Sequence, residues 1–233
     1  MPTTQARARK TILAPVTPMR ATEGLTRLLA AAVLALVPGL AAAECTDSVF
    51  DDLPFTLCEV AAGDDLRLFL NGEDGAAQGS FAGIEAALEA RGEVLVFAMN
   101  AGMYHPDRRP VGLYIQDGEE QRGIVTNAGP GNFGMLPNGV FCIHDAGFSV
   151  VASRAFAAAP PPCRHATQSG PMLVIDGALH PRFLVDSDSA LVRNGVGVSG
   201  DGQRAVFAIS NQPVTFHQFG RLFRDHLSLP QAL

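Results

Sequence analysis

The sequence predicts an α+β fold, in which a mostly antiparallel sheet and a few packed helices form a single domain. From Leu66 onward, short apolar runs alternate with glycine-containing turns, a pattern typical of strands. Three of the breaks are Asp-Gly pairs, which supply the positive φ angles of tight hairpins. Only two segments have helical spacing, so sheet is expected to predominate. The three pairs are Asp117-Gly118, Asp176-Gly177 and Asp201-Gly202.

Eight apolar runs are predicted to be strands, and their boundaries follow from the flanking turn residues. The run 94–99 is continuously apolar, as in a strand buried on both faces. The predicted strands cover residues 66–70, 94–99, 111–115, 140–143, 148–151, 172–175, 195–198 and 206–210.

Two helices are predicted, one between the first two predicted strands and one after the last. Residues 81–90 are rich in Ala, Leu and Glu, and Gly92 is suited to end that helix. The second helix begins at Thr215, which forms a capping box with Gln218. Its apolar face repeats at helical spacing, and residues 229–233 after it resemble the start of another strand. The face consists of Phe216, Phe219, Phe223 and Leu227.

Residues 1–43 are predicted to be a secretory signal peptide that is removed after Ala43. An apolar run at 28–40 follows two arginines and ends in three alanines, the order found in such peptides. The long lead before this run suggests that translation starts at Met19. The run is shorter than the roughly 20 residues of a membrane span, so we expect a periplasmic or secreted protein without a membrane span.

The charge of residues 44–233 argues against a nucleic-acid partner. Residues 1–43 hold five of the 17 basic and one of the 23 acidic residues, which leaves 12 and 22 and a formal charge of −10. Nucleic-acid affinity depends on neutralising phosphates, which this balance disfavours. All 12 remaining bases are arginine, and a single well-placed arginine can still bind one phosphate.

The four cysteines suggest two disulfides, because their number is even and an exported protein meets an oxidising compartment. Of three possible pairings, we favour Cys45 with Cys58 and Cys142 with Cys163, since each pair is closer in sequence. Buried free thiols are the alternative. The spacing lacks the C-x-x-C pattern of a zinc site.

Polar residues at the ends of predicted strands are candidates for a site. Asn100 follows the apolar run 94–99 and must find hydrogen-bond partners or face a ligand. The motifs MNAGMY (99–104), PVGLY (110–114), GPGNF (129–133), PNGVF (137–141), ATQSGPML (166–173) and RNGVGV (193–198) occur in this order. Over residues 58–233 the chain resembles the phosphodiester glycosidase family, which includes an enzyme that removes N-acetylglucosamine from a phosphodiester.

This resemblance implies site residues, each of which has a structural alternative. Asn100 would orient the substrate, or it would satisfy loop backbone groups. Arg193 would hold phosphate and stabilise its charge, or it would be a surface arginine. His217 is the candidate acid or base, and it could approach His105 in space; a surface or core role is the alternative. The predicted substrate-binding residues are Tyr104, His105, Thr167, Ser169, Gly170 and Asn194, of which 167–170 can also be a plain turn.

No metal site is predicted, although a divalent cation remains possible. The six histidines form no H-E-x-x-H motif. Residues 186–189 resemble the start of a calcium loop, but the glycine at position six and the glutamate at position twelve are missing. No other cofactor is expected.

The predicted function is that of an exported hydrolase that cleaves a sugar 1-phosphodiester. Glycoside cleavage usually needs two carboxyl groups, but a phosphate leaving group needs little protonation, so an arginine and one base can suffice. The alternatives are a non-catalytic envelope module that binds glycan or phosphoglycan, and a carbohydrate hydrolase with no phosphate requirement. The oligomeric state is left open.

The end of the sequence bears on this expectation. In the family, the second helix leads to a strand and then to an Asp-Gly motif that helps to build the site. The sequence stops at Leu233 without that motif. We therefore expect either a fragment or a chain without its last strand and acidic motif, and activity is in doubt in the second case.

Overall fold

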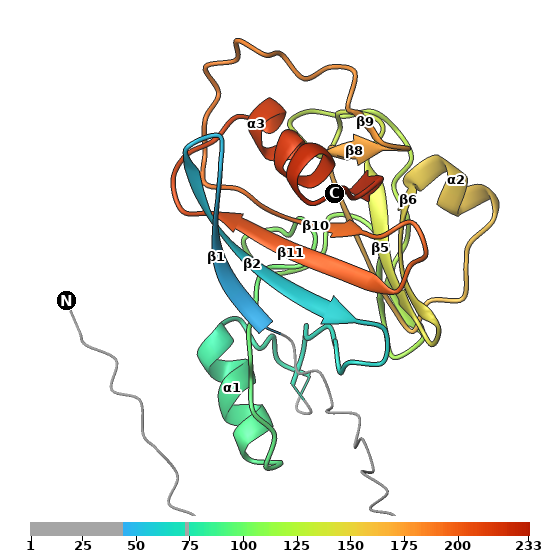
Figure 1. Cartoon of the computed structure of the whole chain (residues 1–233). Coiled ribbons are helices and arrows are strands. Elements are labelled where there is room, and N and C mark those ends of the chain that lie inside the picture. The colour runs from blue at the N-terminus through green and yellow to red at the C-terminus, as the bar shows by residue number, and fades with distance from the viewer. Residues whose placement is uncertain (1–43, 73–74) are drawn as a thin grey trace, which may run out of the picture. The chain divides into compact units, whose positions relative to one another are not determined.

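The structure, a computed structural model, describes residues 44–72 and 75–233. Antiparallel sheet predominates and is accompanied by a few short helices, which confirms the predicted α+β class (Figure 1). The predicted signal peptide, residues 1–43, and the predicted start at Met19 lie outside the described residues.

The larger sheet has seven strands, and every neighbouring pair in it is antiparallel. Its order is β1 (Glu44–Phe50), β2 (Leu53–Ala61), β11 (Arg204–Ser210), β10 (Asn194–Val198), β12 (Gln231–Ala232), β8 (Val174–Ile175) and β9 (Ala178–Leu179).

The smaller sheet has five strands and is also antiparallel throughout. Its order is β4 (Glu119–Arg122), β3 (Tyr114–Gln116), β7 (His165–Ser169), β5 (Gly139–His144) and β6 (Gly147–Ala152).

The helices are short. They are α1 (Phe81–Glu89), α2 (Ser153–Ala158), α3 (Phe216–Arg221) and a π-helical turn η1 (Leu222–His226) that continues α3. Both predicted helix starts are capped. The Thr215 Oγ1 accepts a hydrogen bond from the Gln218 N–H at 3.2 Å, and the Gln218 Oε1 accepts from the Thr215 N–H at 2.9 Å, which confirms the capping box.

The apolar residues assign the helices and sheets to four layers. In β11, Val206 and Ala208 pack with Phe219 and Phe223 of the α3–η1 segment. The intervening Ala205 and Phe207 belong to a second core that includes Phe141 and Ile143 of β5. Successive side chains of a strand point to opposite faces, so α3 covers one face of the larger sheet and the smaller sheet covers the other.

The outer face of the smaller sheet is covered by α2. Val140 and Cys142 alternate with the inward-facing residues of β5 and pack with Phe156 of α2 in a third core. The layers are therefore α3–η1, the larger sheet, the smaller sheet and α2.

Six of the predicted strands are confirmed at least in part, and two are wrong. Residues 66–70 and 94–99 lie outside both sheets. Their apolar composition reflects one-sided packing: Leu66, Phe97 and Met99 contact the second core, whereas Val94 is 83% exposed. A continuous apolar run predicts burial, but a strand also needs a neighbour with which to pair.

Both favoured disulfides are confirmed. Cys45–Cys58 joins β1 to β2, and Cys142–Cys163 joins β5 to the segment between α2 and β7. Within residues 44–72 and 75–233, no helix has the length and hydropathy that a membrane crossing requires.

Candidate functional site

A cavity of about 850 Å³ lies between the extended segments 66–70 and 95–104, the end of β7 and the start of β10. Seven of the nine predicted site residues line it, although they come from three separate parts of the chain. They are Asn100, Tyr104, Thr167, Ser169, Gly170, Arg193 and Asn194.

Two of the predicted residues contact each other directly. The Asn194 Nδ2 donates a hydrogen bond to the Asn100 Oδ1 at 2.7 Å. Asn194 is the first residue of β10, and Asn100 follows the extended segment 94–99. The hydrogen bond therefore joins the RNGVGV motif to the MNAGMY motif, although the two asparagines are 94 residues apart in sequence. Each amide keeps further donor or acceptor capacity for a ligand.

The glycine after Asn100 allows this approach. A Cβ on Gly102 would lie 2.3 Å from the backbone oxygen of Gln168 and 2.5 Å from the Thr167 Oγ1. Only glycine fits so close to β7 without displacing it. Gly102 thus brings the Asn100 loop against Thr167, which is itself buried.

Gln168, between two predicted ligands, is a structural residue. Its Oε1 accepts hydrogen bonds from the Leu113 and Val125 N–H groups, both at 3.0 Å, and its Nε2 donates to the Val125 carbonyl at 2.6 Å. The side chain is 1% exposed and ties two loops to β7. Ser169 and Gly170, the next residues, lie on the cavity wall with it, and among the described residues their polar groups are not used in this way.

Arg193 is a buried cation at the cavity, with only 8% of its surface exposed. Its Nε donates to the Val214 carbonyl at 2.9 Å and its Nη2 to the Ser189 carbonyl at 3.1 Å. Its Cζ lies 3.6 Å from the centroid of the Phe216 ring, a cation–π contact. Burial lowers the pKa of Arg193 from its ordinary value.

A stack of three rings packs against the Arg193 guanidinium. Phe216 is parallel to Phe183 at 5.2 Å between ring centroids, and Phe183 is stacked on His180 at 5.0 Å. Because Phe216 is the first residue of α3, the capping box fixes the ring on which the guanidinium rests.

The cations of the cavity wall differ in their partners. Arg67 forms ion pairs with Asp65 and Glu93, and these hydrogen bonds raise its pKa. Arg108 lies over the ring of Tyr104, at 5.2 Å. In the described part of the chain, Arg193 and Arg108 have no carboxylate within ion-pair distance, and the cavity wall contains no Asp, Glu or His.

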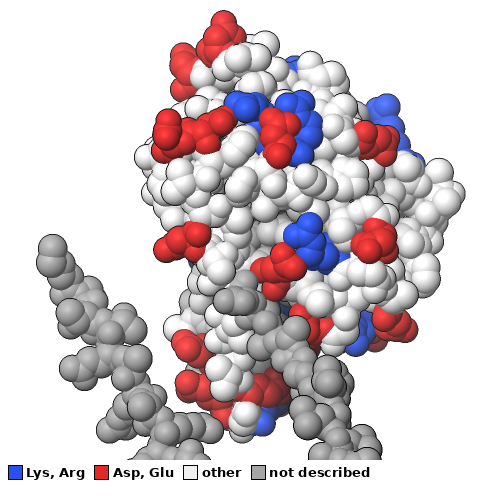
Figure 2. Space-filling view, in the orientation of Figure 1, with Lys and Arg blue, Asp and Glu red and all other residues white. Residues whose placement is uncertain are grey.

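Several arginines elsewhere on the surface are paired with neighbouring acids. On the face shown in Figure 2, most basic side chains touch acidic ones. Arg204 pairs with Glu59 at 3.0 Å, and Arg221 pairs with both Asp51 and Asp225. Arg193 differs from these arginines because it is buried and its partners are two carbonyls and a ring.

The two predicted histidines do not line the cavity. His105 is exposed in the loop after Tyr104, and His217 is half-buried on α3, next to Phe216. The structure thus brings together the amide, hydroxyl and guanidinium groups of the prediction but not its imidazoles.

Sequence reasoning missed Arg108 and the role of the ring stack. Phe216 was assigned to the apolar face of the helix, although one side of its ring carries Arg193. Phe183 lies in an irregular segment with no periodic pattern. The turn residues Pro106 and Asp107, which precede Arg108, are the one signal that bears on its placement.

The predicted calcium-like segment is an exposed loop. Asp186 and Asp188 are both exposed, and the Ser189 N–H donates to the Ser187 Oγ at 3.3 Å. Across the residues that the structure describes, no three or more His, Cys, Asp or Glu side chains gather closely enough to hold a metal ion.

Comparisons with known proteins point to one family. The phosphodiester glycosidase family model matches residues 93–233. The curated protein YigE of Escherichia coli strain K12, described as uncharacterized, is 33% identical over 168 residues, which cover 72% of this chain and 65% of YigE. The chain thus spans just under two thirds of that relative's length.

Two solved structures resemble the fold at low sequence identity. The zebrafish N-acetylglucosamine-1-phosphodiester alpha-N-acetylglucosaminidase catalytic domain, auto-inhibited by its pro-peptide, has a TM-score of 0.52 at 15% identity, covering 82% of this chain and 68% of that chain. A hypothetical protein from Synechocystis has a TM-score of 0.49 at 13% identity, covering 82% and 55%.

Proposed function

Since the chain belongs to the phosphodiester glycosidase family, we propose that it is an exported hydrolase that cleaves the bond between a sugar and a phosphodiester. Its place would be the periplasm or the medium, where its two disulfides are stable. Its substrate would be a carbohydrate joined to phosphate.

One observation carries the proposal: a buried arginine without a carboxylate partner faces a cavity whose described wall has no acidic residue. Burying an unpaired charge is costly, so an anionic ligand at this position would be strongly favoured. Of the Arg193 nitrogens, Nη1 makes no hydrogen bond to the residues that the structure describes. That nitrogen would donate to a phosphate oxygen.

The proposed reaction replaces one bond to the anomeric carbon. Water attacks that carbon, the bond from carbon to the phosphate oxygen breaks, and the phosphate leaves as a monoester with the electron pair. Arg193 would stabilise the charge on the departing phosphate, and the water proton would pass to a base or to solvent. Asn100 and Asn194 would orient the sugar, together with Thr167, Ser169 and the Gly170 backbone.

His217 remains the proposed base, with His105 as a substrate contact. His217 adjoins Phe216, which lines the cavity, but it does not line the cavity itself. In this proposal the phosphate is a good leaving group, so one base is sufficient.

The described wall also favours a second candidate, a non-catalytic module that binds phosphoglycan. A wall with arginine, amides and hydroxyls, and without a carboxylate or imidazole among the described residues, can bind a phosphate without cleaving it. The two functions differ in whether free sugar is released.

The test uses the methyl phosphodiester of N-acetylglucosamine 1-phosphate and measures free N-acetylglucosamine. We expect release by the wild type and a loss of about 100-fold in Arg193→Gln, the scale for removing one donor to developing charge. Arg204→Gln is the control, because Arg204, the first residue of β11, pairs with Glu59 of β2 and does not line the cavity.

Phosphate binding is measured in parallel, because Arg193→Gln can also lower stability. Inorganic phosphate should raise the melting temperature of the wild type and of Arg204→Gln, but not that of Arg193→Gln, since a ligand stabilises only a state that binds it. Stabilisation without sugar release would favour the binding module. Equal cleavage of a plain methyl glycoside, indifferent to phosphate, would indicate a carbohydrate hydrolase instead.

A further inference from the structure

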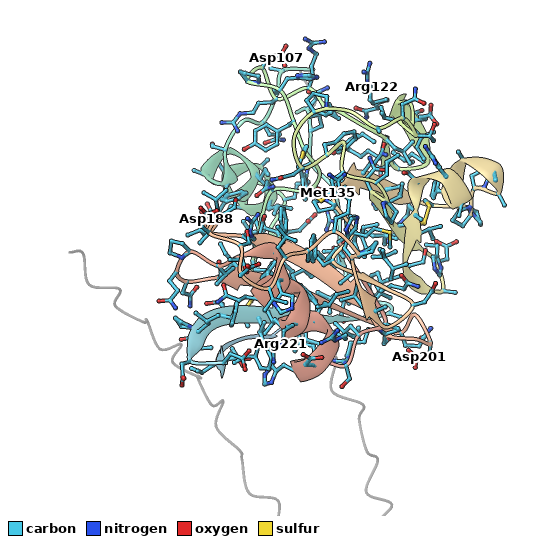
Figure 3. The ribbon with its side chains drawn as sticks, turned by 90° about the horizontal axis from the view of Figure 1, so that it is seen from above. Asp107, Arg122, Met135, Asp188, Asp201 and Arg221 are labelled. Carbon is cyan, nitrogen blue, oxygen red and sulfur yellow. A yellow bond between two sulfur atoms is a disulfide. The ribbon has the colours of Figure 1, made fainter. Side chains whose placement is uncertain are left out.

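A hairpin at residues 103–111 borders the cavity. The Val111 N–H donates to the Met103 carbonyl, and the His105 N–H donates to the Arg109 carbonyl, both at 2.9 Å. The Arg108 N–H closes the turn by donating to the His105 carbonyl at 2.8 Å. Asp107, next to Arg108 in this turn, lies at the edge of the molecule in Figure 3.

Arg108 has a backbone conformation that favours glycine. Its φ is +71°, and long side chains at such angles cost about 1 kcal/mol or more. Five other non-glycine residues of the described chain have a positive φ: four are Asp, which is enriched at such angles, and the fifth is the short Ser228. Arg108 is the exception: it is a long side chain at a position where a glycine would relieve strain.

The Arg108 side chain is directed toward the cavity rather than to the nearest acid. Its Cζ lies 5.2 Å from the ring centroid of Tyr104, and both residues line the cavity. The adjacent Asp107 carboxylate instead accepts a hydrogen bond from the Arg109 Nε at 2.6 Å and another from the Arg109 N–H at 3.2 Å. The Arg108 guanidinium makes no hydrogen bond or ion pair within the described residues.

We propose that Tyr104 and Arg108 form a sugar-binding subsite at the cavity mouth, where Arg108 determines affinity for the ring beyond the phosphate. Tyr104 is 47% exposed and offers an aromatic ring on which an apolar sugar face can stack. Arg108, held against that ring, offers a planar set of donors to sugar hydroxyls. This inference rests on the proposed function, in which Arg193 holds the phosphate.

The test compares ligands with and without a sugar by calorimetric titration. The probes are inorganic phosphate and the α-1-phosphates of glucose, mannose and N-acetylglucosamine. In the wild type, at least one sugar phosphate should bind about tenfold more tightly than inorganic phosphate. Arg108→Gly and Tyr104→Ala should abolish this gain and leave the affinity for inorganic phosphate unchanged.

A stability measurement separates recognition from folding. Arg108→Gly relieves the strained φ, so its melting temperature should not fall, while its affinity for sugar phosphate does. Arg109→Ala is the matched control: the neighbouring arginine is paired with Asp107 and does not line the cavity, so the variant should keep the sugar preference.

The outcomes distinguish the two proposals. If the wild type binds inorganic phosphate but gains nothing from a sugar, or if Arg108→Gly keeps the gain, the subsite is overturned while the phosphate site stands. If the wild type binds neither inorganic phosphate nor any sugar phosphate, the proposed function fails as well.

Discussion

Arg193 shows how a single residue is prepared for an anion. Two backbone carbonyls and the face of Phe216 hold the guanidinium, and none of them carries a full negative charge. Such partners fix the position of the cation without neutralising it, so the electrostatic attraction remains available to a ligand. If an aspartate carboxylate accepted the Arg193 Nε hydrogen bond instead of the Val214 carbonyl, it would neutralise the guanidinium and lower its affinity for phosphate.

At this scale the sequence predicted the polar groups of the site better than their supports. Arg193 and Asn194 stand at the start of a predicted strand, and Asn100 ends an apolar run, each within two residues of a glycine, which are visible patterns. Arg108 and Phe183 reach their places through loop geometry, and irregular loops have no periodicity from which contacts can be inferred. His217 was proposed because it lies one position off the apolar face of the helix, but it does not line the cavity.

Two buried histidines predict how stability depends on pH. His165 and His180 are 2% and 1% exposed, and burial lowers the pKa of both below the ordinary 6.5. The Asp117 Oδ1 lies 3.7 Å from the His165 Nε2 and raises the pKa of His165, but this effect is smaller than that of burial. Below pH 6.5 the unfolded chain takes up protons that the folded chain resists, so the free energy of unfolding should fall as the pH falls.

Urea unfolding at pH 7.5 and pH 5.5 measures this effect. The double variant His165→Gln, His180→Gln removes both groups and should show a smaller decrease in unfolding free energy between the two pH values. Lower stability of the double variant at both pH values is expected from the loss of packing and does not affect the comparison. The same decrease in both proteins would show that these histidines are not its cause.

Among the elements, both turn residues and apolar runs decided which strands could be predicted. Asp117-Gly118 and Asp176-Gly177 connect adjacent strands with positive φ at both residues, as their sequence predicts. The β1–β2 hairpin turns at Asp51 and Asp52, which also both have positive φ, yet Asp-Asp is a weak turn signal. The first two strands were not predicted, although β2 pairs with β11 along seven residues. The strands β4, β7 and β9 were not predicted either, because they are too polar or too short to form an apolar run.

The cap of α3 is an element-scale support of the site, which can be tested at Thr215. Thr215→Ala removes the hydroxyl that accepts the Gln218 N–H, at a cost of about 1 kcal/mol, or about 2–4 °C in melting temperature. Because the next residue is Phe216, under Arg193, affinity for inorganic phosphate should fall as well.

Thr215→Ser is the matched control, since it keeps the hydroxyl and with it both reciprocal bonds of the box. Its melting temperature and phosphate affinity should stay near those of the wild type. A Thr215→Ala protein that loses stability but binds phosphate as before would show that the cap does not position Arg193.

For the described residues as a whole, the layered fold determines where the charges lie and which of them are paired. The outer surface carries an excess of acidic residues, and many of its arginines are paired with them (Figure 2). The cavity lies where the extended segments meet the ends of β7 and β10, and two of its three arginines, Arg108 and Arg193, have no carboxylate partner among the described residues. Composition predicts the net charge, but only the fold determines which arginines remain unpaired.

The disulfides are expected to support this layered structure to different extents. Each closes a loop, of 13 residues for Cys45–Cys58 and 21 for Cys142–Cys163, and a loop of this size contributes about 3 kcal/mol by restricting the unfolded chain. Cys142 is also fully buried in the third core, whereas Cys45 is exposed. Replacing Cys142 and Cys163 by Ala should therefore cost more than replacing Cys45 and Cys58.

Urea unfolding of the two double-alanine variants measures the difference. Reducing agent separates the two contributions. It should remove from the wild type most of the stabilisation that comes from closing the loops. The variant with Cys142→Ala should still be less stable than the reduced wild type, because it also lacks the buried Cys142 side chain. If the Cys45→Ala, Cys58→Ala protein were the less stable variant, the hairpin of β1 and β2 would contribute more to the larger sheet than its position at the edge implies. Its pairing with β11 would then depend on the covalent link, because β2 lies between β1 and β11.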